Sequence, residues 1–110
     1  MGAQVCQATA ELFRALGHPV RIRVLELLQE GPRPVSELLA EVGVEAASLS
    51  QQLVALRRFG IVSSSRRGPN LVYQLSNSAV AQLMDVARET TVAMLPDPAR
   101  GAPRAAAHSV

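Results

Sequence analysis

The sequence predicts a mainly α-helical domain in which five helices are combined with one two-stranded β-hairpin. Apolar residues recur at helical spacing in five segments, glycine or proline separates these segments, and β-prone residues surround a Gly-Pro turn. At 110 residues the chain can build one core but not two. We expect a folded domain over residues 1–95 and a disordered Pro/Ala-rich tail over residues 96–110.

The first two helices are separated by a Gly-His-Pro tripeptide. Apolar spacing predicts a helix over residues 4–16, which the tripeptide at 17–19 ends. Pro19 suits the first position of the second helix because its missing N–H would have no partner there. The second helix is expected to run to about Gln29, since Gly31 and two prolines follow.

A short third helix and a fourth helix follow in close succession. Ser36 is expected to cap the third helix and Gly43 to end it. The fourth helix is predicted over residues 45–58. With 100° between successive residues of a helix, Leu49, Leu53 and Leu56 fall on the same side, which we expect to face the core. The residues on the opposite side are then Ala47, Ser48, Gln51, Val54, Ala55 and Arg58, with Ser50 and Arg57 on a flank.

Residues 61–75 are predicted to form the hairpin. Two β-prone runs surround Gly68 and Pro69, and the alternation places three apolar side chains on one face: Leu71, Tyr73 and Leu75. Arg66 and Arg67 lie at the tip. Two helices joined by a tight turn, followed by a hairpin with basic residues at its tip, indicate a winged helix-turn-helix.

The charge of the chain is unevenly distributed. Residues 24–45 contain five glutamates and one arginine, whereas residues 46–84 contain four arginines and no acidic residue. All 11 basic residues are arginine, whose planar fork suits phosphate and guanine, although an alanine-rich and lysine-free composition can equally reflect genomic base composition. We therefore predict binding to double-stranded DNA, with the fourth helix in the major groove. The expected contact residues are Ala46, Ala47, Ser48, Ser50, Gln51, Arg57, Arg58, Arg66 and Arg67.

The first and last helices lie outside this unit. The last helix, capped by Ser76 or Asn77, is expected to extend to about Leu95. Each of the two helices carries an apolar stripe with no evident cover in its own protomer, so we expect a homodimer. The expected contact residues are Val5, Ala8, Leu12, Val80, Leu83, Ala87 and Met94. Such a dimer would place two recognition helices about 34 Å apart on an inverted repeat.

Four stretches resemble one known family: FRALGHPVRIRVLELL at 13–28, VSELLA at 35–40, SLSQQLVALRRFGIV at 48–62 and VYQL at 72–75. Together they resemble the bacterial ArsR/SmtB transcriptional repressors over roughly residues 10 to 90. The resemblance implies a homodimeric winged-helix repressor that leaves its operator when an inducer binds. Gln52 stands where many members have histidine, and its flanking position predicts an effect on packing more than on base recognition.

The resemblance also implies two places where a metal could bind. One is a thiolate site near residues 35–39, where this chain has no cysteine. The other lies on the last helices, where the matching positions are approximately Asn77, Ala79, Thr90 and Ala93. Neither set suits a metal ion. We therefore expect no metal and no cofactor, and the identity of an inducer stays open.

A few residues invite other interpretations. Cys6, the one cysteine, excludes an internal disulfide and is expected to be a small buried thiol near the dimer contact, with a redox-responsive repressor as an alternative. His18 is expected to have a structural role in the bend, and His108 lies in the tail. Asp85 and Glu89 are expected to form a solvated acidic face.

Other classes of function fit the sequence less well. An enzyme is disfavoured because no histidine is placed near a nucleophile and an acid. A winged helix that binds a protein partner is the stronger alternative, but such a face should carry large apolar groups, and only Val54 does so here. No apolar run has the roughly 18 residues of a membrane span, and the N-terminus lacks a signal-peptide pattern, so we expect a cytoplasmic protein.

Overall fold

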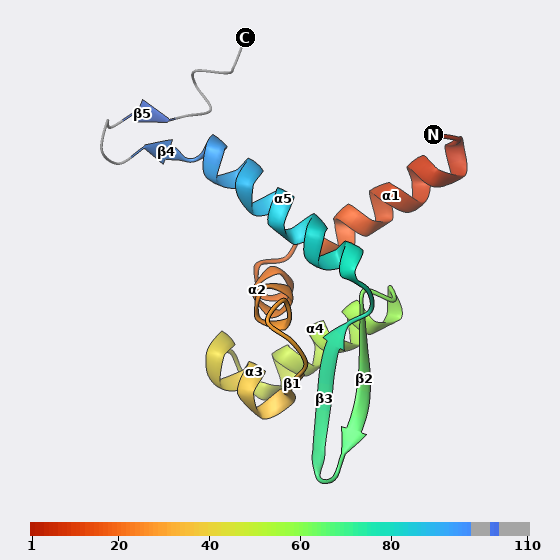
Figure 1. Ribbon diagram of the computed structural model, residues 1–110, viewed down its shortest axis with the longest axis vertical. Coiled ribbons are helices and arrows are strands. Elements are labelled where there is room, and N and C mark those ends of the chain that lie inside the picture. The colour runs from red at the N-terminus through yellow and green to blue at the C-terminus, as the bar shows by residue number, and fades with distance from the viewer. Residues whose placement is uncertain (98–101, 104–110) are drawn as a thin grey trace.

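A computed structural model of the chain describes residues 1–97 and 102–103. The predicted five helices and hairpin are confirmed, and α1 and α5 extend away from the rest of the molecule (Figure 1). The elements in chain order are α1 (Ala3–Leu16), α2 (Pro19–Leu28), β1 (Arg33–Pro34), α3 (Val35–Val42), α4 (Ala46–Arg58), β2 (Val62–Arg67), β3 (Asn70–Leu75), α5 (Ser78–Met94), β4 (Pro96–Asp97) and β5 (Ala102–Pro103).

The hairpin belongs to a three-stranded antiparallel sheet with the strand order β1-β3-β2. β2 and β3 pair along their whole length, and the turn between them consists of Gly68 and Pro69. Gly68 has a φ of +62°, which favours glycine. The strand β1, at Arg33–Pro34, was not predicted because two residues that include a proline show no alternation.

The core lies between α2 and the helix-turn-helix of α3 and α4. Leu49, Leu53 and Leu56 of α4 are at most 2% exposed, as the rotation predicted. They pack in one cluster with buried residues of α2 and α3, among them Leu25 and Leu38, which are fully buried. Burying a leucine stabilises a fold by roughly 1.5–3 kcal/mol, so this cluster fixes which side of α4 faces outward.

The start of α2 has the predicted form. Pro19 occupies its first turn, and His18 precedes it as the capping residue. His18 Nδ1 accepts a hydrogen bond from the N–H of Val20 at 3.2 Å. The structural role expected for His18 is therefore confirmed: it pairs one of the donors that a helix start leaves without a helical partner.

The start of α3 differs from the prediction. Ser36 does not cap this helix, because the helix already begins at Val35 and Pro34 is the capping residue. Pro34 pairs with Val72 in the sheet, so the chain passes directly from the strand into the helix. The predicted end at Gly43 is confirmed, with a φ of +74° that starts the turn toward α4.

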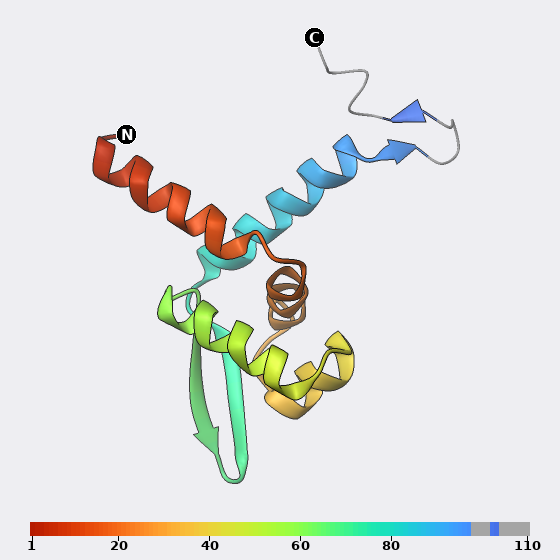
Figure 2. The same ribbon diagram turned by 180° about the vertical axis from the view of Figure 1, so that it is seen from behind.

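The helices α1 and α5 cross near the core and then diverge, which both ribbon views show (Figures 1 and 2). Near the crossing, Leu12, Val80 and Leu83 pack against the protomer's own core. The expectation that these stripes lack cover within the protomer is therefore wrong for these three residues. Farther out the helices are uncovered, and their exposed large apolar side chains are Val5, Phe13, Val86, Val92, Met94 and Leu95.

Two further expectations concern the tail of the chain and membrane spans. Most of the tail at 96–110, including His108, lies outside the described residues. Within it, β4 and β5 form a two-residue antiparallel pair. Among the helices that the structure describes, none combines the length and the apolar character needed to cross a membrane.

Candidate nucleic-acid interface

The outer face of α4 carries small and polar side chains. Its exposed residues are Ala46, Ala47, Ser50, Gln51, Arg57 and Arg58, whereas Ser48, Val54 and Ala55 are half-buried. The centre of the exposed face therefore lies nearer to Ser50 and Arg57 than the sequence rotation indicated. α2 packs on the flank that contains Gln52, which accounts for the lower exposure of Ser48 and Ala55 beside it.

The hairpin, called the wing here and defined as β2, β3 and their turn, lies beside α4. A hydrogen bond of 3.3 Å from Arg57 Nη1 to Ser64 Oγ joins the last turn of α4 to β2. At the far end of the wing, Arg66 and Arg67 are exposed, and Arg66 Nη1 is 3.5 Å from the carbonyl oxygen of Pro69. The arginines of α4 and the wing tip thus belong to one connected surface.

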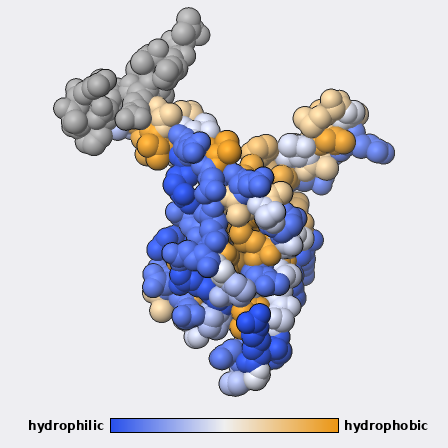
Figure 3. All heavy atoms as spheres, viewed as in Figure 1, coloured by the Kyte–Doolittle hydropathy of each residue, from blue (hydrophilic) through white to orange (hydrophobic). Residues whose placement is uncertain are grey.

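This surface is positively charged without compensating acids. In the described part of the chain, the ion pairs are Arg23–Glu41, Arg33–Glu30 and Arg88–Asp85. Arg57, Arg58, Arg66 and Arg67 take part in none of them. Hydrophilic residues dominate the wing tip, at the lower end of the molecule (Figure 3). Four exposed guanidinium groups with no carboxylate partner suit a polyanion such as a nucleic-acid backbone.

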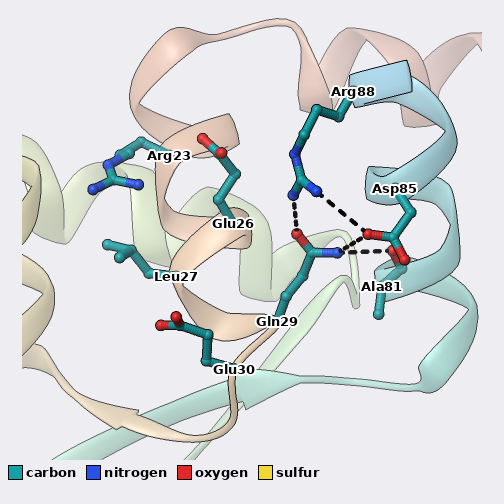
Figure 4. Close-up of a pocket in the computed structure, with 8 residues that line it drawn as sticks. All are labelled: Arg23, Glu26, Leu27, Gln29, Glu30, Ala81, Asp85 and Arg88. Atoms are coloured by element: carbon teal, nitrogen blue, oxygen red, sulfur yellow. Dashed lines mark hydrogen bonds and ion pairs between the residues drawn. The ribbon is translucent and has the colours of Figure 1, made fainter. Parts of the chain in front are cut away.

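An open pocket of about 490 Å³ lies elsewhere, between α2 and α5 (Figure 4). Gln29 Nε2 donates to the carbonyl oxygen of Ala81 at 3.0 Å and to Asp85 Oδ1 at 2.9 Å, and Gln29 Oε1 accepts from Arg88 at 2.7 Å. Asp85 is exposed, as expected for a solvated face, and it also takes part in this link between the helices. These polar groups bond to one another, which leaves the pocket floor few free groups for a ligand.

The residues considered for metal or redox chemistry are dispersed. Among residues 1–97 and 102–103, no three His, Cys, Asp or Glu side chains lie close enough to hold a metal ion. Cys6 is exposed in the single chain, so the expectation of a buried thiol is wrong for one protomer alone. Asn77 Oδ1 accepts from the N–H of Val80, and Thr90 Oγ1 donates to the carbonyl oxygen of Val86.

A helix-turn-helix whose second helix stands beside an arginine-bearing wing defines a winged helix-turn-helix DNA-binding protein. Residues 18–64 match the family described as "Bacterial regulatory protein, arsR family". The chain belongs to this ArsR family and is a DNA-binding transcriptional regulator. The family resemblance deduced from the sequence is confirmed.

Two relatives from mycobacteria match most of the chain. Rv0081 of Mycobacterium tuberculosis, an HTH-type transcriptional regulator, is 47% identical over 89 residues, which are 80% of this chain and 78% of Rv0081. The crystal structure of Rv0081 has a TM-score of 0.76 and covers 83% of this chain and 92% of that chain. The homodimeric winged helix-turn-helix domain of Mb0332 from Mycobacterium bovis is 27% identical and has a TM-score of 0.77. The match covers 84% of this chain and 86% of the Mb0332 domain.

A third relative is a repressor. The biofilm growth-associated repressor of Xylella fastidiosa is 40% identical over 76 residues, which are 69% of this chain and 67% of the repressor. These relatives are described as transcriptional regulators or DNA-binding domains.

Sequence reasoning missed two side chains that hold the surface in place. Ser64 was treated only as a strand residue, although its hydroxyl oxygen accepts a hydrogen bond from Arg57 of α4. Arg21 bonds both to Gln52 of α4 and to α1. A signal for Arg21 was present, because α1 ends just before the Gly-His-Pro tripeptide and its last carbonyls have no helical donor.

Proposed function

We propose that the chain is a homodimeric repressor that reads an inverted-repeat operator through α4 and the wing. The observation that carries this proposal is the joined surface of α4 and the wing, on which Arg57, Arg58, Arg66 and Arg67 have no carboxylate partner in the described part of the chain. A small, polar helix face flanked by such arginines fits a major groove between two phosphate backbones.

The surface divides into two kinds of contact. Ser50 and Gln51 are exposed on α4 and can reach base edges, and glutamine can bond adenine through both ends of its amide. Ala46 and Ala47 allow the helix start to approach closely and can touch a thymine methyl group. The arginines contribute the electrostatic part, which positions the protein on any sequence.

The dimer forms through the uncovered parts of α1 and α5. On the side that carries Phe13 and Val86, both 59% exposed, their apolar side chains have no cover in the single chain, whereas Val92 lies on the other side of α5. The hydroxyl groups beside them are already bonded, since Thr9 donates to Val5 O and Thr91 to Ala87 O within their helices. Faces of this kind can be buried without leaving polar groups unpaired. The homodimeric state of the Mb0332 domain supports the same assembly here.

Regulation in this proposal does not use the family's two familiar metal sites. Residues 35–39 supply no thiolate. At the other site, the side chains of Asn77 and Thr90 are held by hydrogen bonds within α5 and its cap, and neither residue is a strong metal ligand.

The experiment is a salt titration of DNA binding. A duplex is selected from a random-sequence pool by the protein, and the dissociation constant is measured between about 50 and 200 mM salt. If the four arginines of both protomers contact phosphates, log K should fall against log salt with a slope of about −7. A slope near zero, or no enrichment of any duplex, would overturn the proposal and favour a protein-binding winged helix.

A further inference from the structure

We propose that Arg21 is a positioning residue that sets the placement of the recognition helix α4 relative to the dimerisation helix α1. This inference rests on the proposed function, since it concerns how the two halves of the operator are matched. It assigns to Arg21 a role in the selection of half-site spacing.

The geometry consists of one guanidinium group and two acceptors. Arg21 Nε donates to Gln52 Oε1 at 2.7 Å, and Arg21 Nη1 donates to the carbonyl oxygen of Ala15 at 2.9 Å. The three residues come from α2, α4 and α1. A guanidinium is planar, so its donors keep fixed directions and the two acceptors are held in a fixed relation to each other.

The contact with α1 has a cause in the sequence. Ala15 lies in the last turn of α1, which ends at Leu16, so its carbonyl has no donor within the helix, and Pro19, four residues later, has no N–H to offer. Ala15 is 1% exposed, so its carbonyl cannot turn to water freely. Arg21 supplies the missing donor, and a cation at the C-terminal end of a helix also interacts favourably with the helix dipole.

The contact with α4 restrains rotation of this helix about its own axis, which its core contacts restrain from the inward side alone. Leu49, Leu53 and Leu56 hold the inward side of α4, whereas Gln52 lies on its flank and is half-buried. A short hydrogen bond at the flank resists rotation of the helix about its axis. Rotation of α4 would redirect Gln51, the neighbour of Gln52 in sequence, away from its base pair.

In the proposed dimer, each α1 belongs to the interface and each α4 enters one half-site. The separation of the two recognition helices then depends on how α1 and α4 are joined within a protomer. Arg21 bonds to both. The wild-type protein should prefer one separation of the two α4 helices. Loss of either bond should allow a range of such separations.

The test compares Gln52→Met and Arg21→Lys with the wild-type protein. Gln52→Met keeps the length of the side chain and removes its amide, including the oxygen that accepts from Arg21, so the bond from Arg21 to the Ala15 carbonyl can remain. Arg21→Lys keeps the charge but replaces the planar fork by a single ammonium. The matched controls are Arg23→Lys, on the exposed side of α2, and Gln82→Met, on an exposed part of α5.

The measurements are the melting temperature, the dimer fraction, and the affinity for three duplexes. The duplexes are the operator selected by the wild-type protein and two versions with its spacer changed by one base pair in each direction. We expect both variants to bind the selected operator about tenfold more weakly, the loss of one charge-assisted hydrogen bond. Their discrimination between the three spacers should shrink, while their affinity for unrelated DNA and their dimer fraction stay the same.

Three outcomes separate the explanations. Equal weakening on all DNA, in parallel with a lower melting temperature, would show a merely structural role. An unchanged spacer profile in Gln52→Met would refute the positioning role, even if Arg21→Lys were damaged by direct loss of a phosphate contact. If the wild-type protein selects no duplex, the proposed function itself fails. If the wild-type protein binds its operator and the variants bind it equally well, only the role of Arg21 fails.

Discussion

Arg57, in the last turn of α4, donates a hydrogen bond of 3.3 Å to the hydroxyl oxygen of Ser64 in the wing. Arg57 is exposed and Ser64 is half-buried, and the bond joins the two elements that would contact neighbouring parts of a duplex. The bond therefore holds one arginine between the groove-binding helix and the wing. It leaves the remaining donors of that guanidinium free for phosphate oxygens.

Replacing these two residues separately should separate charge from positioning. Arg57→Ala should weaken binding to every duplex and reduce the magnitude of the salt slope by about one per protomer, because one phosphate contact is lost. Ser64→Ala keeps the charge, so the slope should stay unchanged and the affinity should fall by less than about threefold, the effect of a weak exposed hydrogen bond. The measurement is fluorescence anisotropy on the selected duplex across a salt series.

The control for this pair is Arg23→Ala, which removes the same charge from α2, where the arginine lies 3.9 Å from Glu41. Its salt slope should equal that of the wild type. If Arg57→Ala and Arg23→Ala change the slope by the same amount, Arg57 does not contact phosphate and the effect is one of net charge.

Gln51 and the wing arginines should fail in different ways when they are replaced. Gln51→Ala should relax discrimination at one or two base pairs by about 1–3 kcal/mol each and leave binding to unrelated DNA unchanged. Arg66→Ala combined with Arg67→Ala should weaken binding to all sequences alike. Gln74→Ala, an exposed glutamine of β3, is the control for the first change.

Affinities for a panel of single-base-pair variants of the operator would measure both effects. An equal loss on every sequence from Gln51→Ala would remove that residue from base recognition. A sequence-dependent loss from the two wing substitutions would place them at base edges or in a narrow minor groove instead of on phosphates.

The parts of the fold that the sequence predicted are those governed by one-dimensional periodicity. The three leucines of α4 recur at the helical repeat, so their common direction follows from geometry alone. Gly43 and His18 could be placed at helix ends because their local chemistry is sufficient there. The strand at Arg33–Pro34 could not be predicted, since its existence depends on β3, some 40 residues later.

The candidate site shows the same division. The arginines and Gln51 were found from charge distribution and helix rotation, which are local properties. The contacts that hold them in place, from Arg57 to Ser64 and from Arg21 to Gln52, join different elements and depend on the packed structure. For the same reason the apolar stripe at Leu12 was taken to be uncovered, although tertiary packing covers it.

His18 should contribute to stability through its ring nitrogen. His18→Ala removes the acceptor for the N–H of Val20 and should lower the free energy of unfolding by about 1 kcal/mol, the usual effect of losing a helix cap. His18→Asn keeps an acceptor at the same position and should retain most of that stability. Chemical denaturation followed by circular dichroism measures both. A loss in His18→Asn equal to that in His18→Ala would show that the ring's packing, and not its nitrogen, supports the bend.

The dimer prediction can be tested with one substitution at two positions of α5. Val86 is 59% exposed and Val92 is 50% exposed, so in a single chain glutamate at either position should change the free energy of unfolding by less than about 0.5 kcal/mol. The two positions differ in direction. At 100° per residue, Val86 lies beside Leu83 and Thr90, whereas Val92 shares its side of the helix with Asp85, Arg88 and Glu89, with which it lines a shallow surface pocket.

Val86→Glu should therefore place a carboxylate in the proposed interface, and at a two-fold contact it would also meet its own copy in the partner subunit. We expect it to shift the protein from dimer to monomer in analytical ultracentrifugation and to weaken operator binding by at least about tenfold, because two half-sites would no longer be bound as a unit. Val92→Glu, the matched control, should stay dimeric. Dissociation by Val92→Glu alone would place the interface on the opposite side of α5. A dimer that survives both substitutions would show that α5 does not mediate assembly at these positions.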